Sequence, residues 1–362
     1  MTEYLAQVLD AFALEGAAVS CEKYGCGHIN VTYLTVTDTG RRYILQKINQ
    51  TIFRDVEALM GNIKAVTDWL RRQTEDPRGV LRLVPCRDGR CWLRHGDGSA
   101  WRVYDFVENS LCLQQPESPA DFYESAAAFG RFQQMLRDFP ASTLTEILPN
   151  FHNTADRYRI FRETLVRDPM GRAASARAEI DFVLAREEEA SALIRLLEEG
   201  QLPLRVTHND TKLNNVMLDA DTRKALCVID LDTVMPGLSL YDYGDSIRFG
   251  ASSAAEDERD LRKVFVKLDL FETYTRGYLS ACPDLTEGEK ACFPLGAKLM
   301  TLECGVRFLT DWLDGDHYFA VHRPDHNLDR CRTQFRLVTD MEEKWEQMHR
   351  IVEGAAKAAA VL

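Results

Sequence analysis

The chain has 362 residues, of which 45% are hydrophobic and 28% are charged, so it is neither disordered nor collagen-like. This length suggests two or three domains, or two lobes of one enzyme. Acidic residues outnumber basic ones by 56 to 44, and the formal net charge of −12 argues against a protein whose main task is to bind nucleic acid.

Cysteine usage and the N-terminal segment indicate the compartment. The ten cysteines form no C-x-x-C pair and no zinc-finger spacing, so we expect free thiols in a reducing compartment. A two-residue turn at Asp88-Gly89 would place Cys86 opposite Cys91; the pair could form a disulfide, although two free thiols are the expected state. The N-terminus lacks the basic region of a signal peptide, and no apolar run approaches the ~18 residues of a membrane helix. We therefore predict a cytoplasmic protein that contacts neither membranes nor nucleic acid.

Short β-type runs and helical patterns alternate over the first hundred residues. Apolar residues have helical spacing at 3–14 and 55–72. Strands are expected over 18–25, 29–38, 41–48, 81–87, 90–95 and 100–107. This order predicts an N-terminal α+β lobe with an antiparallel sheet, residues 1–108.

The pattern changes beyond this lobe. Residues 109–121 contain two prolines and several polar residues and indicate a linker. Helical spacing then dominates, at 120–138, 154–167, 176–199, 257–280, 287–314 and 328–356. Only short β-type runs at 215–218 and 225–229 interrupt it. We expect a mostly helical C-terminal lobe, residues 109–362.

One block carries the residues that chemistry requires. Residues 207–215 read T-H-N-D-T-K-L-N-N, which contains H-x-D-x-x-x-x-N with Asp210 and Asn215, and V-I-D-L-D follows with Asp230. Phosphoryl transfer from ATP needs a carboxylate that orients the acceptor hydroxyl and accepts its proton, and oxygen ligands that hold Mg²⁺ against the phosphates. Any single one of these residues could simply cap a turn. The ordered set favours a catalytic base at Asp210 and metal ligands at Asn215 and Asp230.

Neighbouring polar residues are expected to support this site. His208 is assigned the structural role of orienting its loop through hydrogen bonds. Asp232 and Asp242 are expected to brace the active-site loops, and Asp242 or Asp245 to cap the helix that starts there.

The turn Y-G-C-G-H-I-N joins two expected strands and supplies Gly25 and Gly27. A kinase folds a flexible lid over the phosphates at such a place, although an ordinary hairpin turn explains the same residues. The next strand reads R-Y-I-L-Q-K. If it aligns with the lysine-bearing strand of kinases, Gln46 takes the phosphate-facing place and Lys47 points away, whereas a one-residue bulge would exchange them.

These motifs, together with Y-D-Y-G-D-S-I-R-F-G and E-C-G-V-R-F-L, resemble the aminoglycoside phosphotransferase and choline kinase superfamily. Within it, the chain resembles the bacterial N-acetylhexosamine 1-kinases over nearly its whole length. The resemblance implies a two-lobed protein-kinase-like fold, ATP as co-substrate, Mg²⁺ as cofactor, and transfer to the anomeric hydroxyl of N-acetylglucosamine or N-acetylgalactosamine. It assigns the base to Asp210 and the metal to Asn215 and Asp230. The implied sugar contacts are His28, Asp210, Phe249, Arg307 and Tyr318, and the implied ATP contacts are Gly25, Gly27, Gln46, Lys47, Phe106 and Glu108.

The residues alone allow other interpretations. Arg307 has the i,i+4 spacing to pair with Glu303 on a helix, and Tyr318 and Phe249 are typical of half-buried aromatic residues. The acceptor could instead be an amino alcohol, an aminoglycoside or another sugar. A pseudokinase that serves as an interaction module is disfavoured, because the base and both metal ligands are present. We expect a monomer whose partners are ATP and a small sugar.

Overall fold

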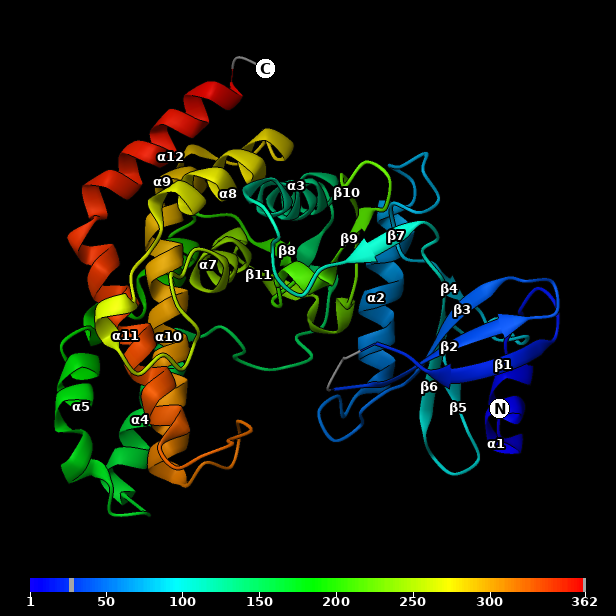
Figure 1. The fold of residues 1–362 in the computed structure, drawn as a ribbon, viewed down its shortest axis with the longest axis horizontal. Coiled ribbons are helices and arrows are strands. Elements are labelled where there is room, and N and C mark those ends of the chain that lie inside the picture. Colours follow the sequence, from blue (N-terminus) through cyan, green and yellow to red (C-terminus); the bar gives the residue numbers. More distant parts are fainter. Residues whose placement is uncertain (26–28, 361–362) are drawn as a thin grey trace.

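The computed structural model describes residues 1–25 and 29–360. Figure 1 shows an N-terminal part built around a sheet, beside a larger and mostly helical C-terminal part. This architecture confirms the predicted α+β class. Within the described residues, no helix is both long enough and apolar enough to cross a bilayer.

The N-terminal sheet consists, in the described chain, of antiparallel strands in the order β1-β2-β3-β6-β4, with β5 also paired to β6. Alternation along β6 sends Trp101 and Val103 to the face covered by α1, and Ala100 and Tyr104 to the face covered by α2. The bounds are α1 Glu3–Asp10, β1 Ala18–Lys23, β2 Val31–Thr37, β3 Arg42–Lys47, α2 Val56–Leu70, β4 Leu83–Val84, β5 Leu93–Arg94 and β6 Ala100–Asp105.

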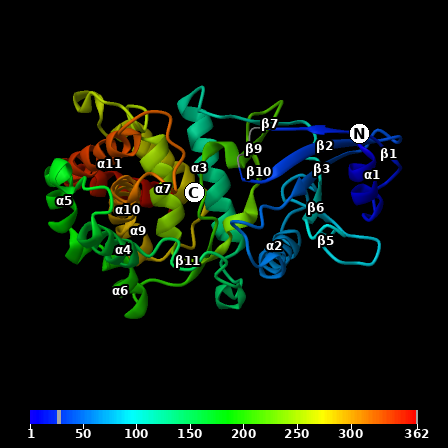
Figure 2. The ribbon, with the colours of Figure 1, turned by 90° about the horizontal axis from the view of Figure 1, so that it is seen from below.

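Helix α2 connects the two parts of the molecule. It begins at an N-cap, Asp55, whose side chain accepts the N–H of Ala58 at 2.9 Å. Its buried side chains form one cluster with Phe132 of the C-terminal part and with Leu231 and Val234 near the candidate site. Figures 1 and 2 both show α2 between the sheet and the helical part, so the two parts share a continuous core.

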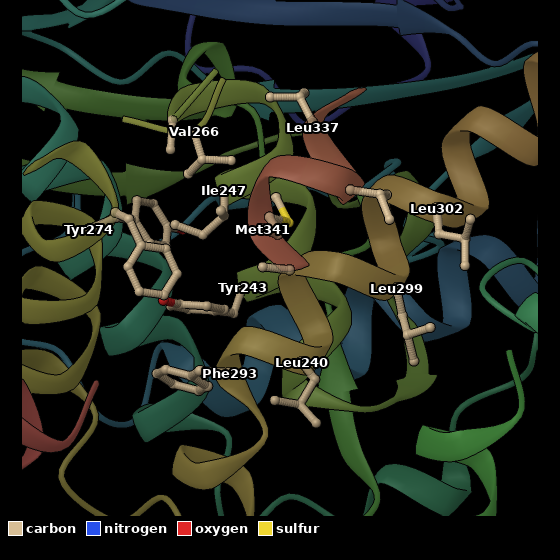
Figure 3. Packing of buried hydrophobic residues seen from close by; sticks show 14 of the residues in the cluster. Leu240, Tyr243, Ile247, Val266, Tyr274, Phe293, Leu299, Leu302, Leu337 and Met341 are labelled. Atoms are coloured by element: carbon tan, nitrogen blue, oxygen red, sulfur yellow. The ribbon is translucent and has the colours of Figure 1, made fainter. Parts of the chain in front are cut away.

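The C-terminal part is organised around a long helix, α10. Figure 3 shows its core, in which the rings of Tyr243 and Phe293 stack with centroids 3.8 Å apart. Two small sheets, β10-β9-β7 and β11-β8, lie on the side that faces the N-terminal part. The bounds are β7 Ser110–Cys112, α3 Pro119–Met135, α4 Thr154–Arg167, α5 Arg177–Leu184, α6 Ala192–Glu198, β8 Arg205–Thr207, β9 Val216–Asp219, β10 Ala225–Val228, β11 Met235–Gly237, α7 Ser239–Gly250, α8 Leu268–Ala281, α9 Glu287–Ala291, α10 Phe293–Asp314, α11 His326–Glu343 and α12 Trp345–Ala359.

Helices α7 and α10 touch through their backbones at Gly244 and Gly296. A Cβ atom built on Gly244 would lie 2.4 Å from the carbonyl oxygen of Gly296, which is closer than two such atoms can approach. Glycine is therefore required at position 244 for this helix pair to pack as it does.

Several predicted segments differ from the structure. The expected linker contains β7, which pairs with β9, and it ends in a capping box formed by Ser118 and Asp121 at the start of α3. The predicted helices 176–199, 287–314 and 328–356 are each divided in two, and Pro294 marks the first turn of the second helix in the middle case. Helix α8 begins at Leu268, later than predicted, because the residues before it form a short 3₁₀ turn and an isolated bridge.

The hairpin at Asp88-Gly89 has a three-residue turn instead of the predicted two-residue turn. The N–H of Cys86 donates to the carbonyl of Arg90 at 2.7 Å, so Cys91 is displaced by one residue from the position opposite Cys86. Both thiols are free. Burial raises the pKa of both, that of Cys86 to about 11, which makes them poor nucleophiles.

Candidate functional site

The candidate catalytic loop, which connects β8 to β9, is held by one buried carboxylate. Asp242 of α7 accepts the N–H groups of His208 and Asn209 at 2.8 and 2.7 Å, and its carbonyl accepts the hydroxyl of Thr211 at 2.7 Å. Burial raises the pKa of Asp242, and these two N–H donors work against that effect. Asp242 thus braces the loop as predicted. It does not cap α7, which begins at Ser239.

His208 orients the loop from inside the protein. It is fully buried, and its ring packs edge-on against Phe129 and Phe132. Its Nδ1 accepts the backbone N–H of Asp210 at 3.3 Å, and its Nε2 lies 2.9 Å from the carbonyl of Ile229. This pattern requires the neutral tautomer with the proton on Nε2. His208 therefore has the structural role that we predicted.

Asp210 is fixed by two donors, one on each carboxylate oxygen. The amide nitrogen of Asn215 donates to Oδ2 at 3.0 Å and to the Asp210 carbonyl at 2.8 Å. The Nζ of Lys212 lies 2.8 Å from Oδ1. Burial alone would lower the pKa of Lys212, but the charge of Asp210 and this hydrogen bond raise it, so Lys212 is a cation. The carboxylate is therefore held in one orientation, with its side chain partly open to solvent.

Asp230 stands at the end of the ribbon, beside this pair. The N–H of Ile229 donates to the carbonyl of Asn215 at 2.9 Å, which brings the next residue close to the amide of Asn215. Asp230 has φ 59° and ψ 60°, a left-handed conformation that aspartate tolerates better than most residues. Asp230 is exposed, yet the surrounding protein and the charges of Asp232 and Asp210 raise its pKa to about 6. This clustering of carboxylates is typical of a metal-binding position.

The donor set of this cluster fits Mg²⁺. Because the amide nitrogen of Asn215 is turned to Asp210, its amide oxygen faces away and is available as a ligand. Together with the Asp230 carboxylate it offers two hard oxygen ligands, and Mg²⁺ usually takes one or two carboxylates plus phosphate oxygens and water. Among the described residues, no group of three or more His, Cys, Asp or Glu side chains has the arrangement of a metal site made by protein alone.

The buried cation of the N-terminal sheet is Arg102 on β6, whereas we expected a cation on β3. Strand β3 pairs with β2 and β6 without a bulge, so Gln46 and Lys47 point to opposite faces. Lys47 lies 5.8 Å from the ring of Trp101, on the face away from the site. Opposite Gln46, Arg102 of β6 is 1% exposed and lies 2.5 Å from Asp232.

Phe106 and Glu108 follow β6 where the chain passes between the two parts. The ring of Phe106 contacts Tyr24 edge-on, and the guanidinium of Arg42 lies 4.1 Å above it. Glu108 forms an ion pair with the same arginine. Both residues follow the end of β6, and the carboxylate of Glu108 already has a partner.

The lid loop is only partly described. Gly25 has φ +74°, a conformation that favours glycine, and nothing lies within 4 Å of the position of its missing Cβ. The predictions for Gly27 and His28 lie outside the described residues.

Of the predicted sugar contacts, the structure brings Arg307 and Tyr318 together. The guanidinium of Arg307 lies 3.3 Å from the Tyr318 hydroxyl, and the Tyr318 side chain is 70% exposed. Glu303 does not pair with Arg307, because its two oxygens bind His152 Nδ1 at 2.9 Å and the hydroxyl of Thr154 at 2.7 Å. The interpretation of Arg307 as a helical ion-pair partner is therefore wrong.

Two arginines, Arg157 and Arg307, lie near the buried carboxylate of Glu303, whose charge acts on both. Arg157 donates to the carbonyl of Phe151 at 2.7 Å, and its Nε is buried without a hydrogen-bond partner in the described chain. Burial and the nearby charge of Arg307 lower the pKa of Arg157. Neither guanidinium forms an ion pair with a carboxylate among the described residues. Phe249, 43% exposed at the end of α7, is on the helix that packs along α10.

Three residues near the site were missed in the sequence. Lys212 could have been found, because it lies two residues after Asp210 within the motif itself. Arg102 stands in an apolar strand, and its partner is distant in sequence, so no local pattern marks it. Arg157 lies on a helix with ordinary amphipathic spacing.

Comparisons with known proteins show the family and the fold of the chain. A family model described as "Phosphotransferase enzyme family" matches residues 20–278, more than half of the chain. The structure is similar to a microcompartment-associated aminopropanol kinase, with a TM-score of 0.63 and 21% identity over 96% of this chain and 98% of that chain. An aminoglycoside phosphotransferase from Alicyclobacillus acidocaldarius gives 0.59 and 13%, over 98% and 96%. The choline kinase LicA from Streptococcus pneumoniae gives 0.53 and 14%, over 94% and 98%. At these identities the likeness shows a shared fold.

Proposed function

Because the chain belongs to the phosphotransferase enzyme family, we propose that it transfers the γ-phosphoryl group of ATP to a hydroxyl group of a small molecule. The observation that carries this proposal is the pair of donors on Asp210, one from Lys212 and one from Asn215. They hold a carboxylate in a fixed orientation next to a second carboxylate, Asp230.

Asp210 would accept a hydrogen bond from the acceptor hydroxyl and direct its oxygen at the γ-phosphorus. As the new O–P bond forms and the bond to the β-phosphate oxygen breaks, the hydroxyl proton passes to Asp210 and ADP leaves with the electron pair. Asn215 and Asp230 would hold Mg²⁺, which when bound neutralises charge on the phosphates. Lys212 would keep Asp210 oriented while the transfer proceeds.

We propose that the acceptor is the anomeric hydroxyl of an N-acetylhexosamine. Arg307 and Arg157 support a neutral acceptor, because neither has a carboxylate partner among the described residues and both would repel an ammonium group. An acetamide brings no charge and offers a carbonyl oxygen to such donors. The anomeric hydroxyl is the most acidic one on the sugar ring, so its proton moves most readily to a carboxylate.

The second candidate acceptor is an amino alcohol or an aminoglycoside, the substrates named for several proteins of the same fold. Such a cation would need a free carboxylate in the site. Asp245 already pairs with Arg248 at 2.9 Å, and Glu303 is occupied by His152. The acidic side chains on α7 and α10 therefore favour the sugar over the amine.

The test compares N-acetylglucosamine with glucosamine at pH 7, in an assay that couples ADP release to NADH oxidation. The two sugars share a ring and differ in an amide against an ammonium. Charge repulsion over ~6 Å at an effective dielectric constant of 20–80 costs about 0.7–3 kcal/mol, so kcat/KM should favour the acetylated sugar about 3- to 100-fold. Choline, ethanolamine, aminopropanol, glucose and one aminoglycoside complete the panel. Turnover of an amine above that of both N-acetylhexosamines would refute the sugar proposal and leave the phosphotransferase proposal standing.

The position of transfer needs its own test. Phosphorus NMR of the product should show coupling to H1, and 1-O-methyl N-acetylglucosamine should not react. Coupling to the H6 protons would show that the primary hydroxyl is the acceptor and would refute the anomeric proposal.

A further inference from the structure

One buried carboxylate, Asp232, joins three separate segments around the candidate metal site. It lies two residues after Asp230 and is 3% exposed. Its Oδ1 accepts the guanidinium of Arg102 from β6, and its Oδ2 accepts the amide of Asn30, the residue just before β2, both at 2.5 Å. The loop that carries a predicted metal ligand is thus tied to the sheet and to the end of the lid loop.

The partners of Asp232 are held in turn by the sheet. Arg102 Nε donates to Gln46 Oε1 at 2.9 Å, and Gln46 Nε2 donates to the hydroxyl of Thr32 at 3.1 Å. Asn30 Oδ1 accepts the backbone N–H of Asn49 at 2.9 Å. A buried polar network whose members all have partners specifies a single arrangement of its groups. A shift of β2, β3 or β6 would therefore be passed to Asp232.

Arg102 is too deeply buried to contact a nucleotide itself. At 1% exposure its guanidinium lies beside the Met60 sulfur and 5.2 Å from the ring of Tyr104. Its hydrogen bond to the loop that carries Asp230 is made through Asp232.

We propose that Asp232 is a positioning residue that couples the lid loop at Asn30 and the sheet cation Arg102 to Asp230. Binding of Mg²⁺·nucleotide then depends on Arg102 and Asn30, although neither is a metal ligand. This inference rests on the proposed function, because it takes Asp230 as the metal ligand.

The test measures nucleotide binding by calorimetry, with ADP and with a non-hydrolysable ATP analogue, with and without Mg²⁺ and without any acceptor. Asn30→Ala removes the link between Asp232 and the lid loop. Arg102→Lys keeps the charge but loses the guanidinium that donates to both Gln46 and Asp232. Arg102→Gln removes the charge. Loss of groups that support metal ligands typically weakens metal binding ~10- to 100-fold, so each variant should weaken Mg²⁺·nucleotide binding in that range, with Arg102→Lys least affected. Binding of metal-free nucleotide should stay near the wild-type value.

Arg78→Gln is the matched control. Arg78 forms a 3.0 Å ion pair with Asp219 and so also links the N-terminal part to the C-terminal part, but away from the metal loop. This variant should bind Mg²⁺·nucleotide as the wild type does. If Arg102 and Asn30 have a merely structural role, their variants should have a lower melting temperature. They should also bind metal-free nucleotide and Mg²⁺·nucleotide equally less tightly.

The outcomes separate this inference from the proposed function. If the wild type binds no Mg²⁺·nucleotide, the proposed function fails. If the wild type binds and folded Asn30→Ala retains full affinity for Mg²⁺·nucleotide, the coupling through Asp232 is refuted. Should Arg102→Gln fail to fold, Asn30→Ala decides the question, because Asn30 is only partly buried.

Discussion

Replacing Asp210 by asparagine keeps the shape of the side chain but removes its negative charge and its ability to accept a proton. Lys212 and Asn215 both donate to this carboxylate, at 2.8 and 3.0 Å. An asparagine offers one oxygen and one NH₂ group, so only one of the two donors can keep its acceptor. The oxygen should turn to the Lys212 cation, which leaves the NH₂ group facing the NH₂ group of Asn215.

The size of the effect has two parts. Loss of a general base and of its positioning lowers kcat by about 10²- to 10⁴-fold. Loss of a charge-assisted hydrogen bond costs about 1.5–3 kcal/mol, which is about 10- to 150-fold if it is expressed only in the transition state. The two overlap because they involve the same carboxylate, so we expect Asp210→Asn to lower kcat by about 10³-fold. Asn215 keeps its bond to the Asp210 carbonyl at 2.8 Å, so the affinity for ATP should fall only slightly.

The assay is ADP release under saturating Mg²⁺·ATP and acceptor, with circular dichroism to show that the variant is folded. Binding of the ATP analogue by calorimetry gives the second measurement. A folded Asp210→Asn variant with kcat close to that of the wild type would refute the role of Asp210 as base. A large loss of ATP affinity with unchanged kcat would instead make Asp210 a nucleotide-binding group.

Four further predictions concern other parts of the structure. Lys212→Met should lower kcat about tenfold. This is the lower end of the range for a charge-assisted hydrogen bond, because the Lys212 side chain is 45% exposed. As a control, replacing the exposed Lys224 by methionine should not change kcat. Asp230→Ala should abolish turnover and weaken Mg²⁺·ATP binding, and added Zn²⁺ should not restore either; activity that depends on bound zinc would contradict the oxygen-ligand site. Gly244→Ala should destabilise the fold by about 1–3 kcal/mol or more through the backbone clash at α10, seen as a lower melting temperature with kcat retained at low temperature; an unchanged melting temperature would show that the helices can separate. Burial alone would raise the pKa of Glu289, but its hydrogen bond from Arg205 holds that pKa below the usual value, so its ion pair stabilises the fold above about pH 4.5 and loses this effect as pH falls through the folded pKa. Glu289→Gln should therefore cost about 3–5 kcal/mol at pH 7, and the difference in melting temperature from the wild type should shrink toward pH 3; a gap independent of pH would contradict the ion pair.

Elements with strong local signals were predicted well from the sequence. Helix α4 spans 154–167 as expected, because its apolar spacing and its N-cap at Asn153 are both local features. The alternation of strands and helices in the N-terminal part also gave the correct order of elements. The errors lie where one or two residues decide the outcome. The turn before Arg90 has one residue more than expected, and β7 is three residues long and is stabilised by β9, far along the chain.

The residues of the candidate site also fall into two groups, those with a local sequence signal and those whose partners are distant in the sequence. The spacing of Asp210 and Asn215 is a local property of one loop, and the sequence motif therefore predicted that these side chains would lie together. Arg102 was missed because its strand is buried on both faces, and an arginine there is tolerated only through Asp232, a partner from the other part of the molecule. Pairings of this kind depend on how the two parts pack, and no periodicity in the sequence reports them.

The contact of Gly244 with Gly296 has a consequence for how acceptor preference can change. Because the backbones of α7 and α10 come so close there, a side chain at position 244 would push the helices apart, so the glycines fix the spacing of this pair. Asp242, near the start of α7, fixes the candidate catalytic loop, while Phe249 at the end of α7 and Arg307 on α10 are predicted acceptor contacts. Side chains at these distal positions can therefore be exchanged while the loop keeps its geometry. A library that varies positions 249 and 307 and keeps both glycines should yield folded variants that differ in the acceptor they use.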